Sequence, residues 1–296
     1  MDQAERLRSR IRQNEEQSNP QLQTKARVFT VTSGKGGVGK TSLSVNLALQ
    51  MQRLGHRTVI IDADFGLANI EVMLGIHPKY NIADLIYKNM SIEDVVIEGP
   101  EGIRFISGGS GVNELVDLER ADLQTFVSKL THLDKIADVI IIDTGAGIAD
   151  AVQEFVLCSP EILLVLTPEP TSTMDAYALL KALNRRKDFV ATDKKINVVS
   201  NRVANEKEGQ TLFQNISIVA SQFLNIELNY LGSLPQDANA TKAVLQQQPV
   251  SLSFPNTAFS KSMRHIAQLL LEGEGDSKSG FTGLFLNLLK SRKGRL

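Results

Sequence analysis

The sequence has a single cysteine, no tryptophan and almost no net charge. The lone Cys158 excludes an internal disulfide framework and indicates a reducing compartment, and we expect it to be a small buried hydrophobic side chain. A net charge of −1 gives no overall basic field that would attract nucleic acid. No apolar run approaches the roughly 20 residues of a membrane-spanning helix, and the first residues lack the apolar core of a signal peptide. These absences predict a cytoplasmic protein that binds no nucleic acid.

A glycine-rich stretch, GKGGVGKTS at 34–42, contains the pattern GxxxxGK[ST] of a phosphate-binding loop. The apolar run 28–31 precedes it and the helical pattern 43–54 follows it, as this loop requires. Glycines let the backbone curl around phosphate, so that N–H groups and the positive end of the helix face the anion. Lys40 then reaches the β- and γ-phosphates, and Thr41 offers its hydroxyl to Mg²⁺. The predicted phosphate-binding residues are Gly34, Lys35, Gly36, Gly37, Val38, Gly39, Lys40, Thr41 and Ser42.

Apolar runs alternate with helical patterns from residue 27 onward. This alternation is typical of an α/β fold with a doubly wound, mostly parallel sheet and helices on both of its faces. No linker-like composition interrupts 27–271, so we expect one domain there. The expected strands lie near 28–32, 57–62, 103–107, 138–143, 161–167, 196–201 and 228–234.

Carboxylates follow two of these strands. In open α/β sheets ligands bind beyond the carboxyl ends of the strands, where Asp62, Asp64 and Asp143 would lie. Asp143 fits the role of holding Mg²⁺, directly or through a water. The plainer alternative is an aspartate that only ends a strand or caps the next helix. Gly145 and Gly147 after it permit a loop that rearranges when a γ-phosphate is present.

The loop also holds a second lysine, Lys35, and KGGVGKT resembles the deviant phosphate-binding loop of the ParA/MinD family of ATPases. The resemblance implies ATP and Mg²⁺ as cofactors and a homodimer in which Lys35 reaches the partner's nucleotide. The stretch DADFGLANIE resembles switch I of MinD-like ATPases. It implies that Asp64 orients the attacking water, that Asp62 lies near the metal, and that Asn69 faces the dimer partner.

The resemblance extends to later strand ends. It implies that Glu169 and Asp175, in PEPTSTMD, lie at the dimer face. It also places four residues around the adenine base, although ordinary turns explain the same residues almost as well. These residues are Asn201, Arg202, Pro235 and Asp237.

The first residues, MDQAERLR, match the DQAxxLR segment of one branch of this family. That branch, FlhG (also called YlxH), regulates flagellar number and stimulates the GTPase FlhF. We therefore expect 1–26 to be a mobile activator segment, the alternative being a plain disordered tail. The implied partner-binding residues are Asp2, Gln3, Ala4, Leu7 and Arg8.

The last residues form a flexible acidic linker, 272–280, and an amphipathic stretch, 281–296, that ends in basic residues. An apolar stripe beside cations is typical of an interfacial anchor, and this one resembles the membrane-targeting helix of MinD. The alternative is a last helix packed on the protein's own core. The predicted membrane-binding residues are Phe281, Leu284, Phe285, Leu288 and Leu289.

Together the motifs predict a MinD-like ATPase that dimerises on ATP, visits the inner face of the cell membrane, and regulates flagellar number through an FlhF-type GTPase. Components of the flagellar base are further candidate partners. The alternatives are a DNA-partitioning ATPase of the ParA type and a MinD of the cell-division site. Near-zero charge and the amphipathic tail argue against the DNA-binding alternative.

Overall fold

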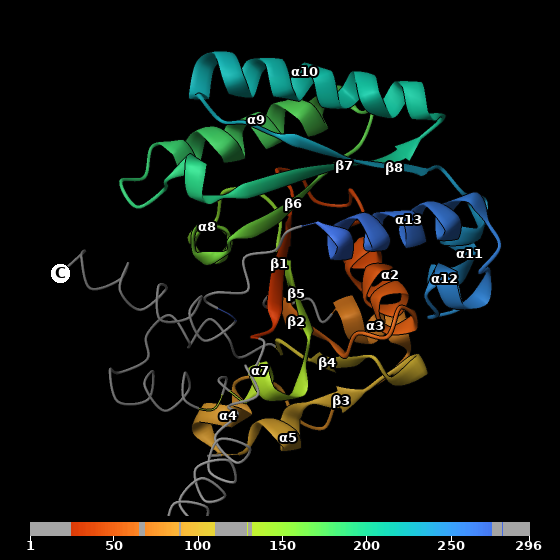
Figure 1. Ribbon diagram of the computed structural model, residues 1–296. Coiled ribbons are helices and arrows are strands. Elements are labelled where there is room, and N and C mark those ends of the chain that lie inside the picture. Colours follow the sequence, from red (N-terminus) through yellow and green to blue (C-terminus); the bar gives the residue numbers. More distant parts are fainter. Residues whose placement is uncertain are drawn as a thin grey trace, which may run out of the picture.

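The computed structural model describes residues 25–64, 69–88, 90–109, 129, 132–273 and 280. Its centre is an eight-stranded sheet with the order β3-β4-β2-β5-β1-β6-β7-β8 (Figure 1). The strands are β1 Arg27–Thr32, β2 Thr58–Ala63, β3 Ile97–Glu98, β4 Arg104–Ile106, β5 Val139–Thr144, β6 Glu161–Leu166, β7 Lys195–Val203 and β8 Asn229–Pro235. The α-helices are α2 Lys40–Arg53, α3 Asn69–Leu74, α4 Asp84–Tyr87, α5 Ile92–Val95, α7 Leu133–Ile136, α8 Asp150–Cys158, α9 Pro170–Asn184, α10 Glu206–Leu224, α11 Ala238–Leu245, α12 Val250–Ser253 and α13 Ala258–Glu272. Short 3₁₀ turns lie at Pro100–Gly102 and Ala191–Asp193.

The prediction of a doubly wound, mostly parallel sheet is confirmed. All seven expected strands are present, each within two residues of its predicted ends. β3, which pairs antiparallel with β4 at one edge of the sheet, was not predicted. Two residues, Ile97–Glu98, are too short to show an alternating pattern, and the tight turn after them makes the pairing local.

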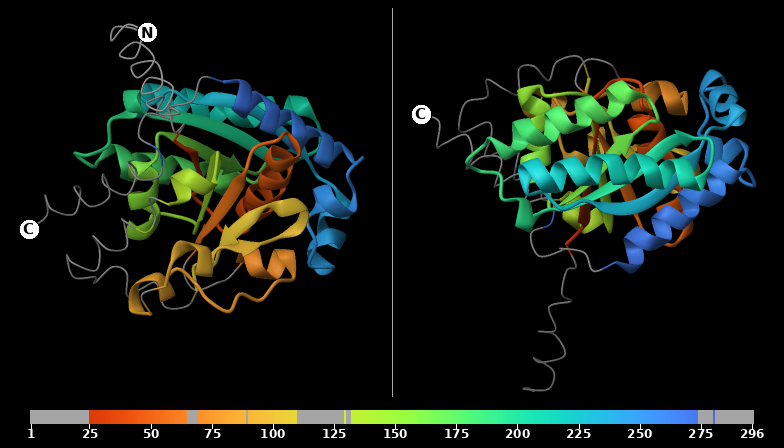
Figure 2. Two further views of the ribbon diagram at one scale, coloured as in Figure 1. Left: turned by 60° about the horizontal axis from the view of Figure 1, so that its bottom comes forward. Right: turned by 90° about the horizontal axis from the view of Figure 1, so that it is seen from above.

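Helices cover both faces of the sheet, and alternate residues of each strand point to opposite faces. Phe29 and Val31 of β1 are buried with residues of α2 and α13, whereas Val28 is buried on the other side. Figures 1 and 2 show α9 and α10 packed together over β6, β7 and β8, with α2 and α13 across the sheet from them. Cys158 is buried, as expected, in the same part of the core as Val28. Burial raises the pKa of its thiol to about 12.

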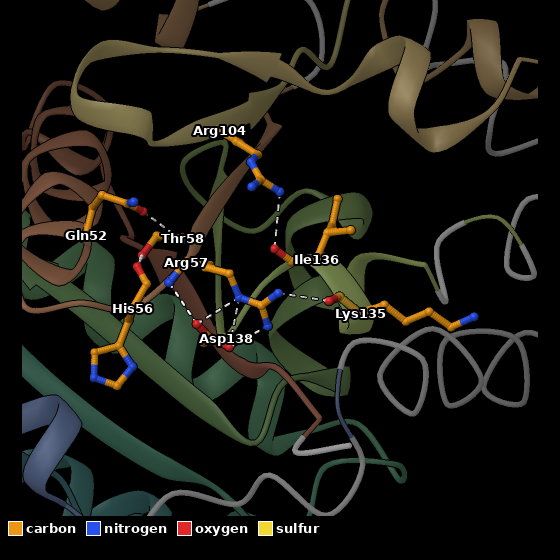
Figure 3. Close-up of polar contacts among 8 residues, drawn as sticks. All are labelled: Gln52, His56, Arg57, Thr58, Arg104, Lys135, Ile136 and Asp138. Atoms are coloured by element: carbon orange, nitrogen blue, oxygen red, sulfur yellow. Dashed lines mark hydrogen bonds and ion pairs between the residues drawn. The ribbon is translucent and has the colours of Figure 1, made fainter. Parts of the chain in front are cut away.

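The end of the sheet at which the parallel strands begin, here called the amino edge, is joined by ion pairs. Arg57, before β2, places its guanidinium 2.7 Å from the carboxylate of Asp138, before β5 (Figure 3). The backbone N–H of Arg57 also donates to that carboxylate at 2.9 Å. Arg27 of β1 donates to both carboxylate oxygens of Glu161 in β6, at 2.5 and 2.7 Å. These contacts fix where neighbouring strands start.

The opposite end, here called the carboxyl edge, is where β1, β2 and β5 lead into the loops that contain the predicted site residues. Parallel pairing of β5 with both β1 and β2 brings these three strand ends side by side. Within the described ranges no helix is long and apolar enough to cross a bilayer.

Candidate nucleotide-binding and hydrolysis site

The glycine loop between β1 and α2 has a backbone that only glycine allows. Gly39 has φ of 96°, a left-handed conformation that costs other residues free energy. A Cβ atom on Gly34 would lie 2.0 Å from the carbonyl carbon of Asp175 in α9, so a side chain at this position would displace one backbone or the other. The loop is therefore curled and packed closely against α9. This packing holds its N–H groups in place before any ligand binds.

Lys40, the first residue of α2, lies in the loop and is only 7% exposed. Burial lowers the pKa of its ammonium group, and the charges of Asp143 and Asp64 act in the opposite direction. A buried cation at the positive end of a helix is unfavourable unless an anion is nearby. The position of Lys40 thus suits the phosphates of a nucleotide, as the sequence predicted.

Two buried carboxylates lie opposite each other at the ends of neighbouring strands. Asp62 of β2 and Asp143 of β5 are direct partners in the sheet register, and both are fully buried. Burial raises the pKa of Asp62 to about 7, with the charge of Asp143 adding to the effect. Burial also raises the pKa of Asp143 to about 6, although hydrogen bonds from Thr41 and Ser44 and the charge of Lys40 oppose it.

The two carboxylates differ in their hydrogen bonds. Oδ1 of Asp143 accepts from the Ser44 hydroxyl at 2.9 Å, while its buried Oδ2 has no hydrogen-bond partner among the described residues. Both oxygens of Asp62 accept backbone N–H groups, from Asp64 at 3.1 Å and from Ile70 at 3.4 Å. A buried oxygen without a partner fits Mg²⁺ or a water bound to it, so Asp143 and the nearby Thr41 hydroxyl suit the metal. Asp62, which the family resemblance places near the metal, also holds the loop that carries Asp64.

Asp64, the predicted catalytic carboxylate, lies where the loops after β2 and β5 meet. Its Oδ2 accepts from the Asn69 side chain at 3.0 Å. A Cβ atom on Gly145 would lie 2.9 Å from its Oδ1, so Gly145 allows the close approach of the two loops. Asn69, which the family resemblance predicts to face the dimer partner, also orients Asp64 of its own chain.

A cavity of about 350 Å³ lies beside the glycine loop, between β7, β8, α11 and α13. Its walls include all four residues that were predicted around the base. The sequence reasoning missed Gln236, Thr241, Val244 and Phe259, which also line it. The spacing of Ala240 and Val244, one turn apart in a helix directly after β8, was the available signal, whereas Phe259 comes from a distant helix.

Asn201 has a second role that the sequence did not reveal. Its side-chain amide donates to the carbonyl of Val38 in the glycine loop at 2.7 Å. Its Oδ1 accepts the backbone N–H of Arg202, a residue held at φ of 58°. Asn201 is 5% exposed, so it braces the phosphate-binding loop from the side of the base cavity.

Lys35, the second lysine of the loop, reaches the start of α9. Its ammonium group is 2.5 Å from Oε2 of Glu169 and 2.9 Å from the Thr171 hydroxyl. Lys35 lowers the pKa of the Glu169 carboxyl. Ile148 and Met174 are apolar residues of the adjoining loop and helix, and they are 57% and 69% exposed. Lys35 is therefore partly exposed and is held by an ion pair at the start of α9.

A glycine loop between a buried parallel strand and a helix, with a lysine inside it and a buried carboxylate on the neighbouring strand, defines a P-loop NTPase. A family model described as ParA, NUBPL iron-transfer P-loop NTPase, matches residues 24–271. The chain belongs to this ParA/MinD family of P-loop ATPases.

Relatives with curated names span most of the chain. Antiactivator FleN of Pseudomonas aeruginosa is 41% identical over 241 residues, which cover 81% of this chain and 85% of FleN. The flagellum site-determining protein YlxH of Helicobacter pylori is 33% identical over 269 residues, or 88% of this chain and 89% of YlxH. These similarities agree with the expected FlhG-like branch.

Solved structures share the fold. The MinC:MinD cell division complex of Aquifex aeolicus aligns with a TM-score of 0.66 at 24% identity, covering 84% of this chain and 97% of that one. MinD of Pyrococcus horikoshii, solved with Mg-ADP, aligns with a TM-score of 0.66 at 19% identity, covering 83% and 96%. At these identities the likeness concerns the fold. The predicted residues of the two terminal segments, within 1–24 and 281–296, lie outside the described part of the chain.

Proposed function

We propose that this protein is an ATP-driven switch that forms a homodimer around bound ATP and regulates the number or placement of flagella. The observation that carries the proposal is the position of Lys35, whose side chain is 34% exposed and forms an ion pair with Glu169 just before α9. Lys40 is buried in its own loop, whereas Lys35 reaches Glu169 and Thr171 at the start of α9. The names of the relatives FleN and YlxH supply the flagellar context.

Each residue of the site has a part in this proposal. Lys40 and the loop N–H groups bind the phosphates, and Asn201 keeps the loop in its curled form. Thr41 and Asp143 would hold Mg²⁺, which neutralises charge on the phosphates. Asp64, fixed by Asn69, orients the attacking water. Lys35 would leave Glu169 and approach the nucleotide of the second subunit, adding positive charge where the transition state needs it.

Iron transfer, which appears in the description of the family model, has no support in this chain. Cluster binding by ATPases of this superfamily requires exposed cysteine thiolates, usually four for one bridging cluster. The only cysteine of the sequence is Cys158, which is buried, and its raised pKa keeps the thiol protonated.

Dimerisation gives the first test, by size-exclusion chromatography with ATP or ADP. We expect wild type to be a dimer with ATP and a monomer with ADP. Lys35→Ala should bind ATP but stay monomeric, whereas Asp64→Ala should remain a dimer because its nucleotide contacts survive while hydrolysis stops. Dimerisation of Lys35→Ala at the wild-type ATP and protein concentrations would contradict the proposal.

Membrane binding is proposed to come from 281–296. Each basic residue near an anionic surface contributes on the order of 1 kcal/mol, and a single short helix binds weakly. Two copies in one dimer act at an effective concentration around millimolar, so ATP would switch membrane binding on. Truncation before Gly280, or Phe285→Asp, should abolish flotation with anionic liposomes and leave the ATP-dependent dimer intact. Undiminished flotation of the truncated protein would exclude this anchor.

The N-terminal segment is proposed to act on an FlhF-type GTPase. Its short apolar stripe is too small for a core and suits a partner's groove. A peptide of residues 1–20 should accelerate phosphate release by the GTPase, and Gln3→Ala or Arg8→Ala should weaken this effect without changing the protein's own ATPase. Equal stimulation by a scrambled peptide would remove the basis for this role.

A further inference from the structure

Ser44 is a buried hydroxyl that none of the motifs described above includes. It lies one turn after Lys40 in α2 and is fully buried. Its Oγ is 2.9 Å from Oδ1 of Asp143 and 3.1 Å from the carbonyl oxygen of Lys40. The contact with Asp143 joins residues 99 positions apart, from the helix that carries the phosphate lysine to the strand that carries the metal carboxylate.

One hydroxyl proton cannot serve both acceptors equally. The ionised carboxylate is the stronger acceptor and the shorter contact, so donation to Asp143 dominates. A bond from serine to the carbonyl four residues earlier is an ordinary feature of helices, and it would have no consequence for Asp143. The two roles of the hydroxyl therefore predict different effects of its removal.

Donation to Oδ1 leaves the other oxygen of Asp143 free. That oxygen, Oδ2, is buried and without a hydrogen-bond partner in the part of the chain that the structure describes. The Thr41 hydroxyl is near enough to lower the pKa of this carboxylate, but it is the predicted metal ligand and would turn toward Mg²⁺ when the metal binds. Ser44 has no such alternative, because it is enclosed by the core on every side.

We propose that Ser44 is a positioning residue for the metal site. It fixes the rotation of the Asp143 carboxylate so that Oδ2 faces Mg²⁺ or its bound water throughout the nucleotide cycle. This inference rests on the proposed nucleotide switch and names one further residue of the same site. Partners that orient metal-binding groups typically contribute 10- to 100-fold in metal affinity.

The test compares ADP binding by calorimetry in Mg²⁺ and in EDTA, using the full chain. For wild type, the dissociation constant in EDTA divided by that in Mg²⁺ measures how much Mg²⁺ strengthens ADP binding. We expect Ser44→Ala to reduce this ratio about 10-fold or more, with the dissociation constant in EDTA unchanged. Ser251→Ala is the matched control, since Ser251 is also fully buried and its Oγ has no hydrogen-bond partner among the described residues. It should leave the ratio at the wild-type value.

Two further variants keep the test decisive. Ser44→Cys fills the same space with a weak donor, so it should fold and still lose part of the Mg²⁺ effect. In an Asp143→Asn background, Ser44→Ala should cause no further loss in the ratio.

An unchanged ratio in Ser44→Ala and Ser44→Cys would overturn the inference, as would an equal loss of affinity with and without Mg²⁺. Failure of wild type to bind nucleotide at all would instead contradict the proposed function, so the two failures are distinguishable.

Discussion

The two edges of the sheet carry charged residues in opposite arrangements. At the amino edge, Arg27 faces Glu161 and Arg57 faces Asp138, so each charge has its counter-charge within the chain. At the carboxyl edge, Asp62 and Asp143 face each other, both buried, and their pKa values are raised. These two pairs of the amino edge are neutral without a ligand. The carboxyl edge has negative charges without a full set of cations, which is the arrangement expected of a site that binds a metal and a nucleotide.

Strand β5 runs from the amino edge to the carboxyl edge and shows why the charges of the two edges can differ. β5 is preceded by Asp138, which is neutralised by Arg57, and Asp143 lies near its end, where neutralisation falls to Lys40 and to a ligand. The apolar residues between them anchor the strand in both layers of the core. Core packing and the paired edge thus stabilise the fold enough to tolerate the unfavourable charges of the other edge.

The largest expected effect comes from breaking the amino edge. Glu161→Gln removes a charge that is 2% exposed and leaves the guanidinium of Arg27, 11% exposed, without its counter-ion. Loss of one partner from a buried pair costs about 3–5 kcal/mol of unfolding free energy. Urea denaturation would measure it, with the double variant Arg27→Met/Glu161→Leu as control, since removing both charges should restore most of the stability. A loss below about 1 kcal/mol would mean that this pair behaves as an exposed one.

The folding stability contributed by the carboxyl edge should fall as pH rises, whereas the contribution of an ion-paired carboxylate rises with pH. The raised pKa values of Asp62 and Asp143, about 7 and 6, mean that the folded state binds more protons than the unfolded chain. The stability that these two carboxylates contribute should therefore be complete below their ordinary pKa of 3.8, fall as pH rises to about 7, and level off above it, for a total of a few kcal/mol. The melting temperature at pH 5 and pH 7.5 would show this fall.

Ligand and mutation provide the controls for this pH effect. Mg-ADP supplies a cation to the site and should flatten the profile between pH 5 and 7.5. Asp62→Asn/Asp143→Asn should flatten it without ligand, because the titrating groups are gone. A ligand-free wild type whose stability rises over this interval would show that the two carboxylates are not the controlling groups.

Much of this architecture was readable in the sequence. Nearly continuous apolar runs identified the seven parallel strands, and GKGGVGKTS identified the phosphate-binding loop, because both signals are local. The roles of Ser44, Asn201 and Asn69 were not readable, since each depends on contacts with residues that only the fold brings close. The family resemblance placed Asp62 near the metal, and the structure adds that its two oxygens accept backbone N–H groups.

Asn201→Ala tests whether support of the glycine loop is separate from metal binding within the carboxyl edge. Its amide bond to the Val38 carbonyl is buried, and loss of such a bond costs about 1–2 kcal/mol, or roughly 10-fold in nucleotide affinity. The loss should be equal in Mg²⁺ and in EDTA, because Asn201 holds the loop and touches no metal-binding group. Ser44→Ala, by contrast, is expected to lose affinity only in Mg²⁺. A Mg²⁺-specific loss in Asn201→Ala would contradict the role of Asn201 in supporting the glycine loop.

The smallest effect is expected from the second pair of the amino edge. Arg57 and Asp138 make several hydrogen bonds (Figure 3), and the pKa of Asp138 is lowered by them, yet their side chains are 51% and 33% exposed. Water screens such a pair, so Arg57→Ala should cost only about 0.2–1 kcal/mol. A double-mutant cycle with Asp138→Ala would isolate the pair from the backbone bond that Asp138 accepts from Arg57. A coupling energy above about 2 kcal/mol would show that hydrogen-bond geometry, and not burial, decides how strongly this edge is held.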